Sequence, residues 1–385
     1  MSEVDENGEL FDATEESVEL ELSGEVFEDL LIQPADWTIG SLYSQIGRQI
    51  DLSPDFQRRN VWSDIGRSNF IESVFLGIPI PQILLSSRAG KKNSYLVLDG
   101  KQRLLALKGF IENEFPLKKL RILKELEGKR WREIEEDDDW HDRLMNTTQR
   151  TAVIRNWTTE KVLYEIFYRL NSGSVKLSPM ELRMSLHPGE FLKYIVAWTE
   201  ELGPLHRLLG RAKPDPRMSD VELSIRHLAF STRITPYAGD LKDFLDRTCV
   251  EFNDRFGNDR EFRRYIEDEL TKMSEAIGVG LDIFPYRKFC RKFSDGEYES
   301  RFNRAVFDVQ VGALSDERVR EVALLEPETF KAVYESVAAR QDFTRAVEFA
   351  TKTPHATKTR FEIFYRAIQG EYGVALEIPD IVVLE

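Results

Sequence analysis

The sequence predicts an α+β N-terminal half followed by an all-helical C-terminal half. Two strand-like runs, Pro81–Ser86 and Tyr95–Leu98, alternate with helical patterns, and a third strand is expected at about 150–156. From Pro179 onward about eight helical segments, separated by Gly, Pro or Asn-Asp signals, replace the strand patterns. The 385 residues, 42% of them hydrophobic, are enough for two ordinary cores.

The first 36 residues are strongly acidic. They hold 13 Asp and Glu residues and no Lys or Arg, whereas the rest of the chain carries 53 basic against 54 acidic residues. Residues 1–36 are therefore predicted to form a disordered tail, with ordered structure beginning near Trp37. Such a tail either keeps the protein solvated or mimics nucleic acid and occupies a basic groove, and both interpretations stay open.

Two helices are expected next. Behind Thr38 as N-cap, apolar residues recur at the spacing of one helical face, at Ile39, Leu42, Tyr43 and Ile46. An irregular, extended segment is expected at 51–62. The second helix is predicted from about Asp64 to Leu76, because Gly77 and Pro79 would end it.

The strand at 95–98 leads directly into the next helix. It ends at Asp99-Gly100, and a helical pattern follows through Ile111. A third extended region is expected at 115–131, with an acidic stretch after it at 133–139. The strand at about 150–156 is predicted to lead into a helix at 159–170.

Two serines mark predicted helix starts in the C-terminal half. Ser178-Pro-Met-Glu181 has the pattern of a capping box with Pro at the first helical position, and Ser219-Asp-Val-Glu222 has a similar pattern. A soft boundary at Pro188-Gly189 completes the predicted division into an acidic tail (1–36), an α+β domain (37–187) and a helical domain (188–385).

The two cysteines, Cys249 and Cys290, belong to no C-x-x-C pair, so a disulfide scaffold is excluded and a reducing compartment is expected. No apolar run approaches the roughly 18 residues of a membrane span. No basic, then apolar signal sequence opens the chain. A cytoplasmic protein is therefore expected.

The strand-to-helix junction at 96–107 carries the most chemical information. A helix that starts directly after a strand offers unpaired backbone N–H groups to phosphate, and Gly100 lets the backbone turn or approach a ligand closely. Arg103 can bind phosphate through two donors, Asp99 can hold Mg²⁺ or polarise a water, and Gln102 can orient that water or a ribose hydroxyl. The same pattern also suits a capped turn with a surface salt bridge.

Two more polar clusters flank this junction in the sequence. Residues 55–62 place Gln57 and Arg58 among aromatic residues, where an arginine can also be stacked for structural reasons. Residues 167–174 lead to the predicted capping box and Arg183, and Asn171 in this stretch also suits a helix C-cap.

Four ordered motifs together resemble the N-terminal domain of the GmrSD-type, modification-dependent restriction endonucleases, a group of prokaryotic domains with a ParB/sulfiredoxin-like fold. The motifs are Gln57-Arg58-Arg59-Asn60-Val61-Trp62, Ile78-Pro79-Ile80-Pro81, Asp99-Gly100-Lys101-Gln102-Arg103, and the block from Phe167 to Arg183. The resemblance covers about Trp37 to Leu186.

This resemblance implies a nucleotide pocket that hydrolyses an NTP with Mg²⁺ and licenses action on foreign DNA. The catalytic residues that it implies are Asp99, Gln102 and Arg103, with Asp99 as the metal ligand. The nucleotide-binding residues that it implies are Gln57, Arg58, Gly100, Lys101, Asn171 and Arg183. Lys101 stands where the family has Gln, so it either adds a phosphate contact or displaces what the Gln positions.

Several other patterns bear on function. The histidines of the C-terminal half, His206, His227 and His355, do not form the pattern of a His-Asn-His nuclease, so that half is expected to dock a partner or sense a substrate. Glu127-x-Lys129 loosely resembles a restriction-nuclease pattern. The basic stretches 118–132 and 287–292 are candidate DNA contacts or ordinary solvated faces. His141 beside the acidic run 135–139 suits a metal site or a solvated turn.

The leading hypothesis is an NTP-binding and NTP-hydrolysing regulator of a prokaryotic restriction or anti-phage system, acting on DNA with a separate nuclease or other effector. The first alternative is a non-catalytic DNA-binding adaptor that retains the pocket only as structure. The second is a nuclease in its own right.

Overall fold

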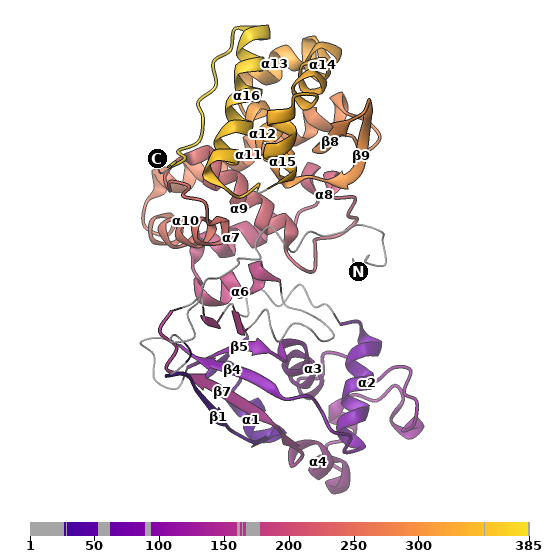
Figure 1. Ribbon diagram of the computed structural model, residues 1–385. Helices are drawn as coiled ribbons and strands as arrows, with labels where there is room; N and C mark the ends of the chain where they lie inside the picture. The colour runs from indigo at the N-terminus through magenta and orange to yellow at the C-terminus, as the bar shows by residue number, and fades with distance from the viewer. Residues whose placement is uncertain are drawn as a thin grey trace. The chain divides into compact units, whose positions relative to one another are not determined.

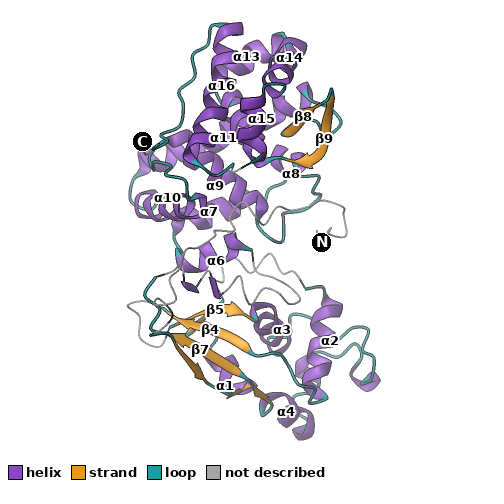
Figure 2. Cartoon of the chain, viewed as in Figure 1, coloured by secondary structure: helices purple, strands orange, loops and turns teal. Residues whose placement is uncertain are grey.

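The computed structural model describes residues 27, 29–52, 62–88, 94–159, 162–163, 165–166, 178–349 and 351–383. The chain divides into two compact units, and the division falls between Leu186 and His187. The N-terminal unit contains a mixed sheet with helices, and the C-terminal unit is built mainly of helices (Figures 1 and 2). The chain is therefore an α+β protein with a helical C-terminal part, as the sequence predicts.

The N-terminal unit is built on a five-stranded sheet with the strand order β1-β7-β4-β5-β3. The pairs β1–β7 and β4–β5 are antiparallel, whereas β7–β4 and β5–β3 are parallel. Strands β4, β5 and β7 confirm the three predicted strands. The bounds are β1 Leu31–Pro34, β3 Ile50–Asp51, β4 Ile83–Ser87, β5 Tyr95–Asp99 and β7 Thr151–Arg155. A separate two-stranded sheet joins β2 (Trp37–Thr38) to β6 (Thr148–Gln149).

Strand β1 corrects the predicted start of ordered structure. It lies inside the stretch predicted to be a tail, and it pairs with β7 from Leu31 opposite Arg155 to Pro34 opposite Ala152. All four of its side chains are exposed, so no alternation of buried and exposed residues marks this strand in the sequence. The backbone of β7, not a hydrophobic pattern, holds it in place.

Four α-helices accompany the sheet before residue 150: α1 Ile39–Gln45, α2 Asp64–Phe75, α3 Lys101–Ile111 and α4 Asp138–Met145. The predicted N-cap is confirmed, because the Thr38 hydroxyl accepts the Ser41 N–H at 3.2 Å. The second helix ends at Phe75, one residue before the predicted Leu76. Leu76 is the C-cap, and Gly77 follows it at φ +67°. Buried residues of α1, α2, α3 and the sheet form the main core of this unit.

The region 115–133 is compact, although an extended region was predicted there. It contains two short 3₁₀ helices, η3 (Lys124–Leu126) and η4 (Trp131–Glu133). Its apolar residues point inward, with Leu117, Leu120, Leu126 and Trp131 all buried. The spacing of these residues fits neither a helix nor a strand, which is why periodicity does not reveal the turns.

Helix α6 (Pro179–Leu186) closes the N-terminal unit, and its capping box is confirmed. The Ser178 hydroxyl accepts the Glu181 N–H at 3.1 Å, and the Glu181 carboxylate accepts the Ser178 N–H at 2.7 Å. Leu182 of α6 belongs to a buried cluster with Leu98 of β5 and Ile154 of β7. This cluster fixes α6 against the end of β5. Most of the helix predicted at 159–170 lies outside the described residues.

The C-terminal unit consists of packed helices, shown in pink to yellow in Figure 1. They are α7 Glu190–Trp198, α8 Pro204–Leu208, α9 Ser219–Thr232, α10 Leu241–Phe256, α11 Arg260–Ile283, α12 Arg304–Leu314, α13 Glu317–Leu325, α14 Pro327–Ala338, α15 Gln341–Glu348 and α16 Pro354–Tyr372. A buried ion network joins three of them, because Asp308 of α12 binds Arg226 of α9 at 2.6 Å and Arg360 of α16 at 2.9 Å.

A β-hairpin corrects the prediction that this half is all-helical. Strands β8 (Arg291–Ser294) and β9 (Glu297–Phe302) pair antiparallel. The two residues between them, Asp295 and Gly296, have φ of 51° and 83°. Positive φ at both central positions is typical of the tight hairpin turns that Asp-Gly favours. Asp-Gly is thus the signal that sequence analysis missed here.

The capping box predicted at Ser219 is wrong. The N-cap of α9 is Met218, at φ +63°, and Ser219 is the first residue inside the helix. The buried Asp220 carboxylate accepts the N–H groups of Asp215 and Val221 at 3.0 and 2.8 Å, so it joins the loop before α9 to the first turn of the helix.

Both cysteines are free and buried, which agrees with the exclusion of a disulfide scaffold. Among the described residues, no helix is long and apolar enough to span a lipid bilayer.

Candidate strand–helix phosphate site

The junction between β5 and α3 has the backbone geometry that its sequence predicts. Strand β5 ends at Asp99, Gly100 follows at φ +95°, and α3 begins at Lys101. The Leu104 N–H makes the first bond of the helix, to the Gly100 carbonyl at 3.0 Å. The N–H groups of the preceding helical residues have no carbonyl one turn back, and Gly100, the N-cap residue, has no side chain that could accept them. The positive end of the helix dipole lies at the same place.

Gly100 is required at this junction for two reasons. Its positive φ is a conformation that residues with a side chain rarely adopt. A Cβ at this position would also lie 2.9 Å from the Ile83 side chain and 3.3 Å from the Arg103 guanidinium. The glycine therefore lets β4 and the Arg103 side chain approach the turn closely.

Arg103 lies one helical turn after Asp99 and bonds to it. Its Nη2 is 2.9 Å from Oδ2 of Asp99, and its Nη1 donates to the carbonyls of Pro81 and Gln82 just before β4. The side chain is largely buried. In this arrangement the guanidinium fastens the junction to β4, so it has a structural role beside the predicted phosphate contact.

Asp99 is the open member of this pair. Its side chain is 48% exposed, and only its Oδ2 atom lies against Arg103. No cluster of three or more His, Cys, Asp or Glu residues that could hold a metal occurs among the residues that the structure describes. A lone exposed carboxylate nonetheless fits Mg²⁺ that arrives with a nucleotide, because protein-bound Mg²⁺ usually takes one or two carboxylates together with phosphate and water.

Gln102 connects the junction to an earlier part of the chain. Its side-chain oxygen accepts the Trp62 N–H at 3.3 Å. Trp62 directly follows residues 53–61, which include the predicted binding residues Gln57 and Arg58 and lie outside the described residues, as does Asn171. Gln102 thus joins two of the four sequence motifs through a direct hydrogen bond.

Lys101, which replaces the glutamine of the family motif, is buried. Burial lowers the pKa of its ammonium group, and the nearby carboxylates of Glu181 and Asp51 oppose this shift. The buried Lys101 ammonium therefore interacts electrostatically with Glu181 of α6 and with the partly exposed Asp51.

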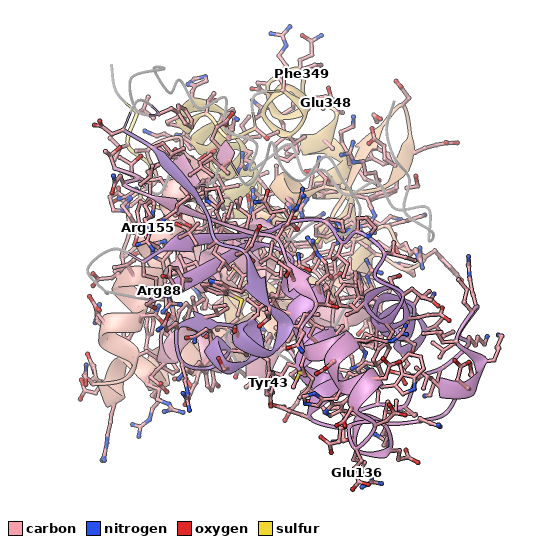
Figure 3. All side chains as sticks on the ribbon, turned by 90° about the horizontal axis from the view of Figure 1, so that it is seen from below. Tyr43, Arg88, Glu136, Arg155, Glu348 and Phe349 are labelled. Atoms are coloured by element: carbon pink, nitrogen blue, oxygen red, sulfur yellow. The ribbon has the colours of Figure 1, made fainter. Side chains whose placement is uncertain are left out.

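Two carboxylates near Lys101 were not predicted as part of the site. Glu181 was recognised only as a helix cap, although it acts electrostatically on Lys101. Asp51 lies at the end of β3 and pairs with Arg88 at 2.8 Å. Arg88 follows β4, and Arg155 ends the neighbouring parallel strand β7; Figure 3 labels both at one side of the ribbon. No sequence signal identifies Asp51, because the parallel pairing of β3 with β5 brings it here.

Arg183 lies on α6 and is fully buried, with Nη1 3.6 Å from the Met180 sulfur. Its helix packs next to β5 through Leu182 and Leu98. The structure therefore places the described end of the closing block, residues 178–183, beside the junction, while the arginine side chain is inside the protein and not on its surface.

The first basic stretch forms an ordered loop that displays its cations. Carboxylates hold the loop from beneath: Glu72 accepts the N–H groups of Arg121, Ile122 and Leu123 at 2.7–3.0 Å. Glu127 accepts those of Lys119 and Leu120 at 2.7 and 2.8 Å. These backbone bonds lower the pKa of the Glu127 carboxyl. Glu127 thus stabilises the loop, which leaves the nuclease interpretation of Glu127-x-Lys129 without support. The exposed cations are Lys118, Lys119, Arg121, Lys124, Lys129 and Arg132.

The second basic stretch is not a continuous exposed surface. Arg291 is buried and donates to the Ser300 and Phe289 carbonyls at 3.1 and 3.3 Å. Lys292 pairs with Glu299 at 2.5 Å and also with Glu348. The hairpin turns these two cations toward the helices of the unit, so they are structural and do not form a DNA-binding patch.

His141 does not lie in a metal cluster of the described residues; its ring packs against Trp131 with ring centres 5.9 Å apart.

Comparison with known proteins adds one finding. Residues 39–188 match the family model described as GmrSD restriction endonuclease, N-terminal domain. Searches with this chain match neither a curated protein nor a solved structure. The matched range contains the β5–α3 junction, Trp62, the basic loop and helix α6. Over residues 39–188 the chain is therefore similar to the GmrSD restriction endonuclease N-terminal domain family.

Proposed function

We propose that this protein is a nucleotide-binding and NTP-hydrolysing component of a prokaryotic restriction system, and that it acts on DNA together with a separate effector. The observation that carries the proposal is the β5–α3 junction. It combines a left-handed Gly100 at the N-cap, a helix N-terminus and the Asp99–Arg103 pair within a segment similar to the GmrSD family. The similarity to this family supports a role in restriction, and the junction supports a nucleotide as the ligand.

Phosphate binding at this junction would use the backbone first. The N–H groups at the start of α3 are directed out of the helix end, where the dipole favours an anion. Arg103 can contribute if its Nη2 exchanges Asp99 for a phosphate oxygen while its Nη1 keeps the Pro81 and Gln82 carbonyls. The guanidinium would then need no large rearrangement, because one of its edges stays fixed.

The same exchange would release the Asp99 carboxylate for the metal. A bound Mg²⁺ would supply charge neutralisation at the phosphates. Asp99 suits this role, since it is half-exposed and, within the part of the chain that the structure describes, bonded only to the Arg103 side chain. Gln102 would orient an attacking water from its position beside Trp62. The pair Asp99–Arg103 is thus proposed as a switch between an ion pair in the free protein and a ligand-bound state.

The burial of Lys101 supports nucleotide binding despite the departure from the family motif. Its ammonium group interacts with Glu181 and Asp51 inside the unit, so it does not replace the backbone N–H groups or Arg103 as the phosphate contact. We propose that Lys101 in place of the family glutamine alters the rate of hydrolysis and leaves the affinity for the nucleotide unchanged.

A thermal-shift assay with ATP, GTP, CTP and UTP, each with MgCl₂, tests binding, and phosphate release with the same panel tests hydrolysis. We expect at least one NTP to raise the Tm and to be hydrolysed, and Asp99→Ala to abolish Mg²⁺-dependent hydrolysis. Hydrolysis that persists unchanged in Asp99→Ala would show that the site assignment is wrong.

The basic loop favours a second candidate function, a DNA-binding adaptor without hydrolysis. Six cations are exposed on a loop whose backbone is fixed by Glu72 and Glu127, so a phosphate backbone would meet a preformed surface. The adaptor predicts salt-sensitive DNA binding with no turnover of any NTP, both in the wild type and in Lys101→Gln. Turnover in either protein argues against it.

A further inference from the structure

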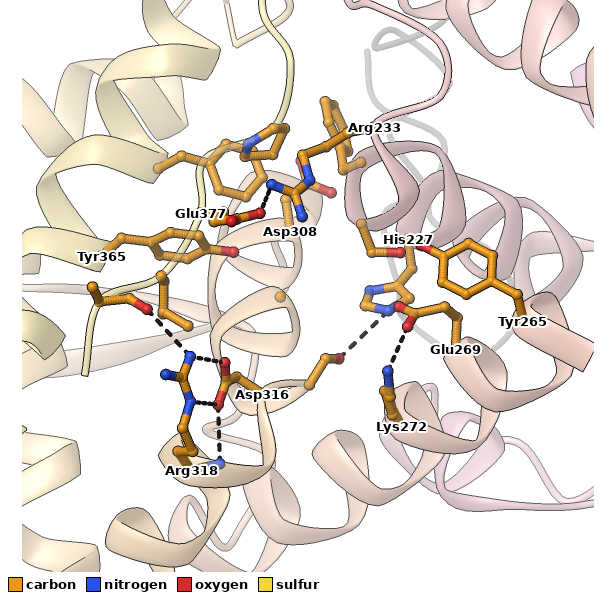
Figure 4. A pocket seen from close by; sticks show the side chains of 18 residues that line it. His227, Arg233, Tyr265, Glu269, Lys272, Asp308, Asp316, Arg318, Tyr365 and Glu377 are labelled. Atoms are coloured by element: carbon orange, nitrogen blue, oxygen red, sulfur yellow. Dashed lines mark hydrogen bonds and ion pairs between the residues drawn. The ribbon is translucent and has the colours of Figure 1, made fainter. Parts of the chain in front are cut away.

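The C-terminal unit contains a cavity of its own, remote in sequence from the β5–α3 junction. Its volume is about 610 Å³, within the range of small-molecule sites. The walls come from α9, α11, α12, α13 and α16 and from the segment that follows α16 (Figure 4). All of its lining residues belong to the C-terminal unit, so the cavity is complete without any other part of the chain.

The inner wall offers rings and uncharged polar groups. Phe230 and Phe361 line it and pack against each other, with ring centres 5.5 Å apart. The Tyr365 side chain is buried, and the residue lines the cavity with its hydroxyl group. In Figure 4 this hydroxyl points into the space between the labelled side chains. Gly312 makes room for it, since a Cβ there would lie 2.5 Å from the hydroxyl oxygen.

His227 adds a second uncharged polar group to this wall. Its Nε2 lies 3.4 Å from the Ser315 hydroxyl. Burial lowers the pKa of His227 to about 4, against the opposing effect of Glu269 and Asp308, so the imidazole is neutral at pH 7. A neutral imidazole and a tyrosine hydroxyl both donate or accept hydrogen bonds, which suits a polar ring compound.

The charged groups of the cavity are already paired. Arg318 bonds Asp316 at 2.6 Å and Lys272 bonds Glu269 at 2.7 Å, each within or near one helical turn. Asp308 is compensated by the buried Arg226 and Arg360. The remaining cation, Arg233, pairs with Glu377, and this pair differs from the others because Glu377 lies on the segment after α16.

That segment, residues 373–383, is here named the strap. It is anchored at its end, where the Tyr237 N–H donates to the Asp380 carbonyl and the Val382 N–H to the Tyr237 carbonyl, both at 2.9 Å. Nearer to α16 it is held by side chains, since Arg318 donates to the Ala375 carbonyl at 3.3 Å and Arg233 pairs with Glu377. The Glu377 side chain is 74% exposed, so water competes for this contact.

We propose that this cavity binds a small anionic ring compound of mononucleotide size, whose anionic group replaces the Glu377 carboxylate on Arg233. The ring would lie against Phe230 and Phe361 and bond to the Tyr365 hydroxyl and the His227–Ser315 pair. Glu377 acts in the free protein as an internal competitor, because it gives Arg233 the kind of partner that the ligand would supply. Ligand binding then frees the middle of the strap, while its anchor at Tyr237 stays.

Calorimetric titration of the full chain tests this site with three kinds of probe: the nucleoside 5′-monophosphates AMP, GMP, CMP and UMP, the corresponding nucleosides, and inorganic phosphate. We expect a monophosphate to bind more tightly than its nucleoside and than phosphate alone, since only the whole molecule reaches both the ring wall and Arg233. Titrations are repeated in Asp99→Asn, which removes the carboxylate of the β5–α3 site. The proposal requires that monophosphate binding to the cavity persists in Asp99→Asn. A wrong assignment of the cavity is thereby distinguished from a wrong assignment of the β5–α3 site.

Four substitutions separate ligand binding from structural effects. Arg233→Gln should weaken monophosphate binding by roughly 10- to 100-fold, the range for loss of a charge-assisted contact. Tyr365→Phe should weaken it by roughly 2- to 10-fold, as one neutral hydrogen bond is lost. Glu377→Gln should instead tighten binding several-fold, because the competing carboxylate is gone. Arg340→Gln, which breaks an exposed Arg–Asp pair away from the cavity, is the matched control and should change nothing.

The opposite effects of changing Arg233 and Glu377 are decisive. If this ion pair were merely structural, either change would lower the stability of the protein, and the two changes would not shift the affinity for the ligand in opposite directions. Tighter binding in Glu377→Gln together with weaker binding in Arg233→Gln supports the proposal. It is overturned if no monophosphate binds, if phosphate alone binds equally well, or if Glu377→Gln weakens binding as Arg233→Gln does.

Discussion

The Arg103 guanidinium lies 2.9 Å from the Asp99 carboxylate, and its other edge donates to the carbonyls of Pro81 and Gln82. One side chain thereby joins the end of β5, the start of α3 and the entry to β4. An arginine that sequence analysis identifies as a phosphate ligand also holds the site together. Loss of phosphate binding in an Arg103 variant would therefore be ambiguous by itself, and Asp99 is the better position for functional tests.

Arg103→Ala is predicted to destabilise the protein. It removes the Arg103 donor from the partly buried Gln82 carbonyl, whereas the Pro81 carbonyl keeps the Gln149 side-chain amide as a donor at 3.0 Å, and an unsatisfied buried group costs about 1–3 kcal/mol. We expect a loss of about 1–3 kcal/mol in the free energy of unfolding, measured by urea denaturation. Lys108→Ala removes another cation paired at i,i+4 on the same helix and should cost less than about 1 kcal/mol. Equal stability of the two variants would show that Arg103 is no structural clamp.

Gly100→Ala tests the geometry of the turn. The substitution adds both strain at φ +95° and a contact of 2.9 Å with Ile83, so we expect a loss of about 2 kcal/mol or more in unfolding free energy. Gly128 is a matched control, because its φ is +81° and no atom lies within 4 Å of a Cβ there. Gly128→Ala should show only the strain, about 1 kcal/mol. A Gly100→Ala protein as stable as Gly128→Ala would contradict the close packing of β4 on the turn.

Lys101→Gln restores the family residue and removes a buried charge. Because the folded state lowers the pKa of Lys101, the folded protein binds this proton less tightly than the unfolded chain does. The charged Lys101 therefore lowers the free energy of unfolding at pH 7. This loss disappears as the pH rises from the pKa of the folded state toward the ordinary value of 10.5. We expect Lys101→Gln to be as stable as the wild type or slightly more stable at pH 7, with the difference shrinking by pH 10.

Urea denaturation of both proteins at pH 7 and pH 10 measures this difference. Asp51 keeps Arg88 and Glu181 keeps the Ser178 N–H as partners in the variant, so no carboxylate is left alone. A loss of more than about 2 kcal/mol at pH 7 would mean instead that Lys101 is an essential buried ion partner.

The acidic N-terminal segment is predicted to compete with DNA for the basic loop. Because β1 pairs with β7, a deletion that tests the segment must end before Leu31. Removal of residues 1–26, which contain ten carboxylates and no Lys or Arg, should tighten non-specific DNA binding at low salt. Much of the gain should vanish as salt rises, since screening weakens both competitors. If full-length and truncated proteins bind DNA equally at every salt concentration in a fluorescence-anisotropy titration, the segment serves only solubility.

The sequence predicts those parts of the fold in which local chemistry decides the structure. The caps at Thr38 and Ser178, the stop at Gly77 and the strand-to-helix change at Asp99-Gly100 all follow from residues that are close in the chain. Strand β1 was not predicted, because a distant strand fixes it, and the capping box of α9 was predicted wrongly, because Met218 at φ +63° and not Ser219 is the N-cap.

The candidate site divides in the same way. Its motif residues are visible in the sequence, and the structure brings Asp99, Gly100, Gln102 and Arg103 together at one turn. Their partners are not visible, since the Pro81 and Gln82 carbonyls, Asp51 and Glu181 reach the junction only through the pairing of β3, β4 and β5 and the packing of α6. The cavity of the C-terminal unit is likewise formed by five helices and the strap, and no single motif marks it.

The proposed function depends most on whether Asp99 at the β5–α3 junction takes part in Mg²⁺-dependent nucleotide binding. Calorimetric titration of each NTP, with MgCl₂ and with EDTA, into the wild type, Asp99→Ala and Glu112→Gln measures this directly. Glu112 is the matched control, as the carboxylate of the Lys108 ion pair at the opposite end of α3. We predict Mg²⁺-dependent binding of at least one NTP that Asp99→Ala weakens by roughly tenfold or more and that Glu112→Gln leaves unchanged. Equal Mg²⁺-dependent affinity in all three proteins, or no binding of any NTP to the wild type, would contradict the proposed function.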